Sequence, residues 1–162
     1  MMEALTRHLL GPGHSVSVGS AGVHGLEGQA IHPLAASALA ERSVDSSDFV
    51  ARQLQPEWVG SADLTVTADR WHRDLLLEYV PDAYGRLFTL REFASLLAGS
   101  QQSGLADVAS LARVADERRR VAARGVPSEV DLADPIGRDL PAFRECLGRV
   151  DAAVSLLVQA LG

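Results

Sequence analysis

The sequence predicts an α/β fold, a three-layer sandwich in which helices flank a short parallel sheet. Two observations support this prediction. Strand-like and helix-like segments alternate along the chain, and the clearest buried strand, residues 63–68, is followed directly by a helix signal. The chain has 162 residues, of which 47% are hydrophobic and 22% charged, as is usual for globular proteins. We therefore expect residues 1–162 to form a single domain.

The first two predicted elements are a helix over residues 1–10 and a strand over residues 15–20. Gly-Pro-Gly at residues 11–13 ends the helix, since neither residue type continues helical geometry well. Serine and valine alternate in residues 15–20, which is the period of a strand with one buried face. The apolar side of the helix consists of Met2, Leu5 and Leu9.

The middle of the chain contains two helices, a helical turn and the clearest strand. Glycines at positions 22, 25 and 28 predict a loop that can approach a neighbouring segment closely. Pro33 opens a helix that runs to about residue 42. A helical turn at residues 56–59 precedes the strand at 63–68, and Asp69 caps the helix that ends near residue 79.

The second half adds a short strand and three helices. Residues 86–88 form the strand, and Thr89 with Glu92 makes a capping box that starts a helix to about residue 98. A further helix covers about residues 105–122. The long final helix carries an amphipathic stripe of Phe143, Leu147, Val150, Val154, Leu157 and Leu161.

Composition excludes several function classes. The formal net charge of −6 argues against nucleic-acid binding, and no apolar run reaches the length of a membrane span. One cysteine and the absence of a signal-peptide pattern fit a cytoplasmic protein. Five histidines show no ligand spacing, so we expect neither a metal nor a cofactor. All fifteen basic residues are arginine.

Residues 131–139 form the stretch with the most chemical content. Pro135 holds Asp134 on extended backbone, Gly137 allows a bend, and Asp139 can cap the final helix. A rigid aspartate on a loop is a common proton donor to a bound substrate. The alternative is that Asp-Pro-x-Gly is only a turn motif without a chemical role.

Four short motifs occur in one order along the chain: Ser20-Ala21-Gly22, Ala51-Arg52-Gln53-Leu54, Ala62-Asp63-Leu64 and Asp134-Pro135. This pattern resembles the low-molecular-weight protein tyrosine phosphatases, a family that includes some arsenate reductases. Residues 88–93 and 134–137 look like the bacterial branch that contains protein-arginine phosphatases. The resemblance spans the chain except for about residues 99–130, which look like a variable insertion.

In that family the first strand ends in a phosphate-binding loop, Cys-x-x-x-x-x-Arg-Ser-Pro, which runs into a helix beginning much like residues 1–5 here. The resemblance therefore implies that this sequence starts where the loop ends. It would lack the first central strand, the nucleophilic cysteine and the phosphate-binding arginine. Cys146 does not match that motif, because Ala152 stands six positions on; we expect Cys146 to be a packed core thiol.

The resemblance also implies a reaction and a set of site residues. In the family a thiolate attacks phosphorus, and an Asp-Pro aspartate, here Asp134, acts as general acid and then as general base. Ser20 matches a residue that supports the phosphate loop, although it could equally bond a local amide. Ile136 stands where many members carry a tyrosine of an aromatic cleft, which makes a phosphotyrosine preference doubtful. Arg138 could steer an anion or be a plain surface residue.

Two hypotheses follow for the whole chain. In the first, it is an N-terminally truncated phosphatase, inactive as given, whose relatives act on a phosphorylated protein or a small phosphate or arsenate anion. In the second, it is a genuine pseudophosphatase, a non-catalytic binding or regulatory module that could pair as a homodimer through an open sheet edge. We further expect residues 118–120 to form a solvated helix face and Trp58 and Trp71 to be packing residues.

Overall fold

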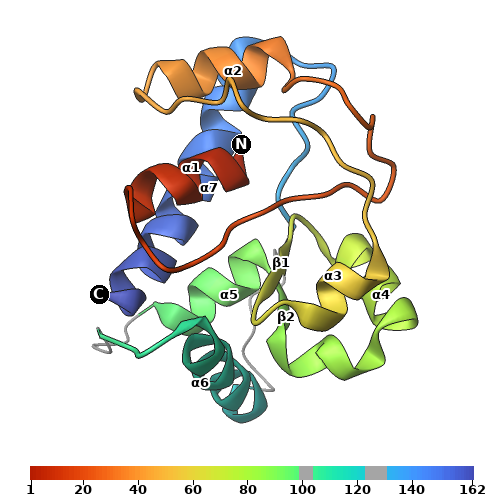
Figure 1. The fold of residues 1–162 in the computed structure, drawn as a ribbon, viewed down its shortest axis with the longest axis vertical. Coiled ribbons are helices and arrows are strands. Elements are labelled where there is room, and N and C mark those ends of the chain that lie inside the picture. Colours follow the sequence, from red (N-terminus) through yellow and green to blue (C-terminus); the bar gives the residue numbers. More distant parts are fainter. Residues whose placement is uncertain (99–103, 123–130) are drawn as a thin grey trace. The chain divides into compact units, whose positions relative to one another are not determined.

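The computed structural model describes residues 1–98, 104–122 and 131–162, and Figure 1 gives the order of the elements. The chain divides into two compact units. Unit 1 comprises residues 1–54 and 133–155, and unit 2 comprises residues 55–132 and 156–162. The single-domain assignment stays a prediction, and the predicted insertion at about 99–130 lies partly outside the described residues.

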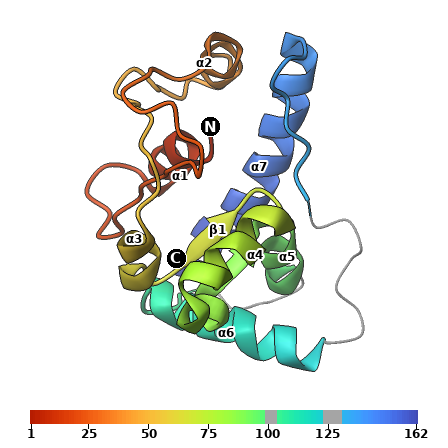
Figure 2. The ribbon, with the colours of Figure 1, turned by 90° about the vertical axis from the view of Figure 1, so that its right-hand side faces the viewer.

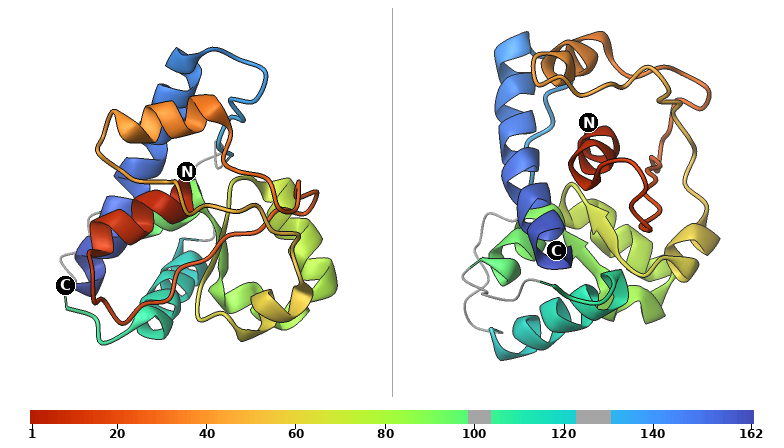
Figure 3. Two further views of the ribbon diagram at one scale, coloured as in Figure 1. Left: turned by 45° about the horizontal axis from the view of Figure 1, so that its top comes forward. Right: turned by 60° about the vertical axis from the view of Figure 1, so that its left-hand side comes forward.

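Unit 1 is built from α1 (Met2–Leu10), α2 (Pro33–Ala40) and residues 140–155 of α7 (Leu140–Leu161). The start of α7 lies beside α2 (Figure 3) because side chains link the two helices. The ring of His32, which caps α2, stacks on Phe143 with centroids 5.0 Å apart. Ion pairs Glu41–Arg144 and Arg42–Asp151 join the same helices.

The three predicted helices of unit 1 are confirmed, but the predicted strand at residues 15–20 is wrong, because these residues are irregular. A strand requires a partner for its hydrogen-bond ladder, and the described residues offer none to this segment. Instead, the Arg7 guanidinium donates hydrogen bonds of 2.6 and 3.1 Å to the carbonyl oxygen of Val18. The alternation of valine and serine favours a strand, but no partner strand among the described residues pairs with it.

Unit 2 contains a two-stranded parallel sheet, in which Thr65 pairs with Leu87 and Val66 with Phe88. Helices α4 and α5 contact this ladder, and α6 contacts α5 (Figure 2). Within the described ranges no helix is long and apolar enough to cross a membrane. The elements are α3 (Pro56–Ser61), β1 (Thr65–Thr67), α4 (Arg70–Tyr79), the 3-10 helix η1 (Pro81–Arg86), β2 (Leu87–Thr89), α5 (Leu90–Leu97) and α6 (Val108–Val121).

Both tryptophans of unit 2 lie on its surface, so the prediction that they are packing residues is wrong. Trp58 on α3 is 46% exposed and Trp71 on α4 is 56% exposed. The core sides of these two helices are formed by Val59 and Leu76 instead, and both of these are buried. One hydrophobic cluster of unit 2 consists of Phe88, Phe93, Leu96, Leu97, Leu111, Ala115 and Ala160.

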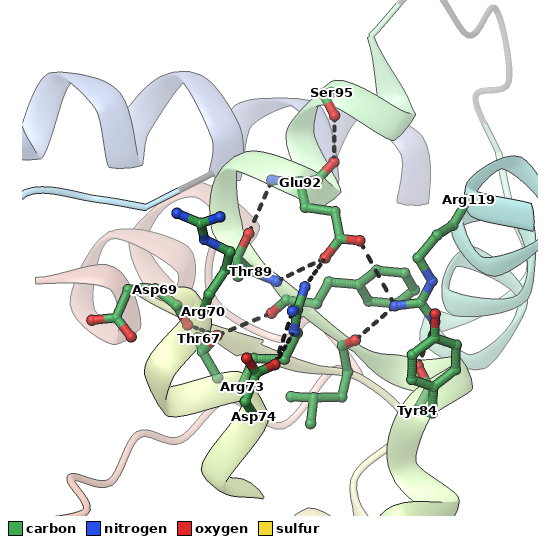
Figure 4. Close-up of polar contacts among 12 residues, drawn as sticks. Thr67, Asp69, Arg70, Arg73, Asp74, Tyr84, Thr89, Glu92, Ser95 and Arg119 are labelled. Carbon is green, nitrogen blue, oxygen red and sulfur yellow. Dashed lines mark hydrogen bonds and ion pairs between the residues drawn. The ribbon is translucent and has the colours of Figure 1, made fainter. Parts of the chain in front are cut away.

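Glu92 of α5 and Arg119 of α6 belong to a buried ionic cluster (Figure 4). The Arg119 guanidinium donates to the carbonyl of Leu87 at 3.0 Å and to Asp116 at 2.7 Å, and it lies over the ring of Phe88. The expectation of a solvated face over residues 118–120 therefore fails at Arg119 and holds at exposed Arg120. The helix period explains the split, since Arg119 is four residues from buried Ala115 and shares its face.

Candidate active site

Asp134 lies in a loop of unit 1 that is fixed by its own hydrogen bonds. Its Oδ1 accepts a 2.9 Å hydrogen bond from the backbone N–H of Ile136, and the N–H of Arg138 donates to the carbonyl of Pro135 at 3.0 Å. Gly137 has φ 78°, a value that glycine adopts without strain. The side chains of Asp134, Ile136 and Arg138 are all exposed, so the three predicted site residues of this loop face solvent.

The N-terminal end of α1 has no side-chain cap. The first intrahelical bond runs from the N–H of Leu5 to the carbonyl of Met1 at 3.0 Å. Among the described residues, the backbone N–H groups of Met2, Glu3 and Ala4 find no acceptor. Such free amides, together with the helix dipole, favour an anion at this end of the helix.

Cys146 lies on α7, in the part of this helix that belongs to unit 1. The thiol is free and buried, as predicted for a core cysteine. Burial raises the pKa of Cys146 most, the charged amino group of Met1 lowers it, and the carboxylate of Asp134 raises it. Burial in turn lowers the pKa of the Met1 amino group.

The hydroxyl group of Ser20 is hydrogen-bonded to a carboxylate of α1. Its hydroxyl donates to Glu3 Oε2 at 2.5 Å, while Arg52 Nη2 lies 3.0 Å and Arg7 Nη2 2.7 Å from the same carboxylate. We call Glu3, Ser20, Arg52 and Arg7 the Glu3 cluster. Sequence reasoning missed Glu3, Arg7 and the role of Arg52, although Ser20 and Arg52 both belong to motifs that carried the family resemblance.

The glycine loop supports this cluster from behind, and its predicted close approach is confirmed. The N–H of Gly22 donates to the carbonyl of Arg52 at 3.0 Å, and the N–H of Leu54 donates to the carbonyl of Gly22 at 2.9 Å. A Cβ added at Gly25 would lie 2.6 Å from the carbonyl oxygen of Arg52. Only glycine fits there, so the backbone of Arg52 is held tightly.

In the part of the chain that the structure describes, no group of three or more His, Cys, Asp or Glu side chains gathers in a way that could hold a metal ion. The site in unit 1 thus consists of an uncapped helix start, an exposed aspartate on a stiff loop and a set of arginines. This combination suits an anionic substrate and a proton transfer.

Comparison with known proteins shows which family this chain belongs to. A family model described as "Low molecular weight phosphotyrosine protein phosphatase" matches residues 1–110. This match covers more than half of the chain. The chain therefore belongs to the low-molecular-weight phosphotyrosine protein phosphatase family, as the sequence resemblance predicted.

Two curated bacterial relatives match over almost the whole chain. A probable low-molecular-weight protein-tyrosine-phosphatase, EpsP, of Ralstonia nicotianae is 28% identical over 165 residues, which span 100% of this chain and 88% of the relative. A low-molecular-weight protein-tyrosine-phosphatase of Streptomyces coelicolor is 30% identical over 170 residues, which span 99% of this chain and 84% of the relative.

Among solved structures, the YwlE arginine phosphatase of Geobacillus stearothermophilus superposes with a TM-score of 0.71 at 23% identity. The match covers 99% of this chain and 82% of that chain. At this level of identity the likeness shows the fold alone. It confirms the predicted α/β class with a short parallel sheet flanked by helices.

Proposed function

We propose that residues 1–162 supply the acid–base residue and the scaffold of a low-molecular-weight protein phosphatase. In this proposal the nucleophilic cysteine and the phosphate-binding arginine belong to a Cys-x-x-x-x-x-Arg loop encoded upstream of Met1. One observation carries the proposal: in unit 1, α1 opens with the backbone N–H groups of Met2, Glu3 and Ala4, which find no acceptor among the described residues. In this proposal a phosphoryl group held by the α1 amides would receive its proton transfers from the carboxyl group of Asp134.

Asp134 is the proposed general acid and base. It would protonate the leaving oxygen when the phosphocysteine forms, and then accept a proton from the water that hydrolyses this intermediate. Its Oδ1 is held by the N–H of Ile136, which leaves Oδ2 as the oxygen that carries the proton. The turn thus fixes the carboxyl group through one oxygen and leaves the other available for proton transfer.

The neighbouring residues have proposed supporting roles. Ile136 is 59% exposed and offers an apolar contact beside the carboxyl group. Exposed Arg138 would steer an anionic substrate toward it. Ser20 would act through Glu3 at the start of α1, because its hydroxyl donates to that carboxylate.

Residues 1–162 alone are proposed to be inactive. Phosphoryl transfer to sulfur requires an accessible thiolate, and Cys146 is buried with its pKa raised mainly by that burial. Losing the nucleophile from a cooperating catalytic set removes most of the rate enhancement. Asp134 would then have no covalent intermediate to serve.

The proposed substrate is a phosphorylated protein. Relatives of this chain are described as tyrosine phosphatases and as a protein-arginine-phosphatase. Ile136 and Gly137 lack the aromatic rings that would stack on a phosphotyrosine. This favours a phosphorylated side chain that is not aromatic, with a free phosphate or arsenate anion as the simplest ligand.

The test begins with the coding sequence upstream of Met1. A chain extended to include a Cys-x-x-x-x-x-Arg loop should hydrolyse phosphoprotein substrates, whereas residues 1–162 alone should not. In the extended chain, Asp134→Asn should lower kcat by about 10²–10⁴-fold. Asp139→Asn is the matched control, because asparagine also caps a helix. Absence of such a loop upstream, or robust turnover by residues 1–162 alone, would contradict the proposal.

A non-catalytic binding module is the second candidate. The described sheet has only two strands, so each has an unpaired edge that could receive a strand from a second copy. This candidate expects a folded, inactive chain whose mass in solution is that of a dimer. Light scattering that shows a monomer at all concentrations would remove the homodimer from it.

A further inference from the structure

Glu3 is a buried carboxylate in the first turn of α1, and only 7% of it is exposed. Burying a carboxylate is costly unless charged or polar partners surround it. Its partners are the Ser20 hydroxyl and the guanidinium groups of Arg52 and Arg7. These partners come from segments 4 to 49 residues away in the sequence, so α1 is tied at its first turn to two distant loops.

The partners of Glu3 are themselves held in place. Arg52 Nε donates to the carbonyl of Ser20 at 3.1 Å, and its backbone is bound by Gly22. Arg7 also donates to the carbonyl of Val18. The groups that bind the Glu3 carboxylate are therefore themselves held by further hydrogen bonds. The carboxylate cannot move without breaking several of these hydrogen bonds.

The Glu3 cluster carries a net positive charge. One carboxylate faces two guanidinium groups, whose side chains are 54% exposed at Arg7 and 42% exposed at Arg52. The free N–H groups of Met2, Glu3 and Ala4 belong to the same first turn of α1 as the Glu3 carboxylate that these guanidinium groups hold. The free amides favour an anion at this helix end.

We infer that Glu3 is a positioning residue of the proposed site: held by Ser20, Arg52 and Arg7, it fixes the first turn of α1 so that the free amides keep one direction toward a substrate oxyanion. The role of Glu3 in substrate binding rests on the proposed function. The immobilisation of the first turn does not, and it can be tested without catalysis. Amides that are already oriented need no reorganisation when charge develops in the transition state.

Cys146 is a native reporter for this test in residues 1–162, because it is the single cysteine there and it is buried in unit 1. The rate of Cys146 alkylation by iodoacetamide is measured against pH in the wild type and in Glu3→Gln. The substitution keeps the shape of the side chain and removes its charge. Asp151→Asn is the matched control, because it removes an ion pair with Arg42 elsewhere in unit 1.

Glu3→Gln should release the first turn, expose Cys146, and raise its alkylation rate several-fold. The midpoint of the pH profile should move down toward that of a free thiol, because burial is the main cause of its elevation. Asp151→Asn should leave both quantities unchanged even if it lowers overall stability. Glu3→Asp, which keeps the charge, should restore part of the wild-type profile.

Identical alkylation profiles for Glu3→Gln and wild type would overturn the inference, whatever the turnover assay shows. If Glu3→Gln does not fold, Ser20→Ala removes one donor, keeps both ion pairs and must shift the profile in the same direction. A failure of the upstream extension to hydrolyse phosphoprotein contradicts the proposed function only. The two failures are therefore distinguishable.

Discussion

The starts of α1 and α5 use the same residue type in opposite ways. Each carries a buried glutamate near two arginines, with Glu3 7% and Glu92 3% exposed. At α5 the glutamate turns back onto its own helix: Glu92 Oε2 accepts from the N–H of Thr89, and the Thr89 hydroxyl accepts from the N–H of Glu92. At α1 the carboxylate turns to side chains, and the amides stay free.

The difference follows from one position in the sequence. Glu92 is three residues after the cap Thr89, which is the spacing of a capping box, and Thr89 has a hydroxyl to complete it. Glu3 is two residues after Met1, which has no side-chain oxygen. A closed helix end adds stability, and an open one keeps donors available for a ligand. The comparison teaches that local stability and anion binding compete for the same N–H groups.

Glu92→Gln should have the largest effect on stability. Glutamine can still complete the capping box but leaves Arg73 and Arg119 without this buried carboxylate. We expect a loss of about 3 kcal/mol in the free energy of unfolding, the low end for a broken buried pair. Arg119 keeps Asp116 and Arg73 keeps Asp74, which limits the loss.

Urea unfolding followed by tryptophan fluorescence measures this effect in unit 2, which holds both tryptophans. Glu78→Gln, an exposed site on α4, is the control and should change little. A loss below about 1 kcal/mol in the free energy of unfolding for Glu92→Gln would contradict this expectation. It would mean that the arginines do not compensate the desolvation cost of the buried carboxylate, because removing the charge also removes that cost.

Gly25→Ala should weaken the α1 end without touching α5. The added Cβ would lie 2.6 Å from the carbonyl oxygen of Arg52, so the loop that supports the Glu3 cluster must shift. We expect about 2 kcal/mol of destabilisation, as for other overpacked sites. Circular dichroism and Cys146 labelling measure it. Gly60→Ala has open space around it and should be neutral or stabilising; equal effects at the two glycines would contradict the clash.

Thr89→Ala should cost about 1 kcal/mol in the free energy of unfolding, because it opens the capped end of α5. Thr89→Ser keeps the hydroxyl and should retain most of that stability. Tryptophan fluorescence in urea again reports the change. If Thr89→Ala and Thr89→Ser were equally destabilised, the methyl packing of Thr89 rather than its cap would be responsible.

The exposed ion pairs should give the smallest effect, seen as a loss of stability in acid. Hydrogen bonding by Arg70 lowers the pKa of Asp131 below its ordinary 3.8, and hydrogen bonding by Arg144 lowers the pKa of Glu41 below 4.5. Both contributions are fully present above those ordinary values and fade as pH falls through the lowered ones. Unfolding midpoints measured from pH 7 to pH 2 should be level above about pH 5 and should fall below that; in Asp131→Asn the fall should be shallower.

Local signals explain which parts of this comparison could be predicted from sequence. The capping box of Thr89 and Glu92 and the caps Asp69 and Asp139 involve residues within three positions, and the structure confirms all of them. The Glu3 cluster was missed because Ser20 and Arg52 are 17 and 49 residues away. Contacts at such separations leave no local pattern.

The errors have the same origin. The alternation in residues 15–20 is a local property, but a strand depends on a neighbour that local sequence does not specify. The burial of Arg119 likewise depends on the carbonyls of Leu87 and Tyr84, more than thirty residues earlier. The Asp134 loop was located by its proline and glycine, while its role as a general acid stays a prediction.

The ion pairs of this protein have one consequence in alkaline solution. The cations in the ion pairs described above are guanidinium groups, and the chain contains no lysine. Guanidinium keeps its proton to a pH above about 12, whereas an ammonium group would lose it nearer 10. Base should therefore leave these bridges intact up to about pH 12.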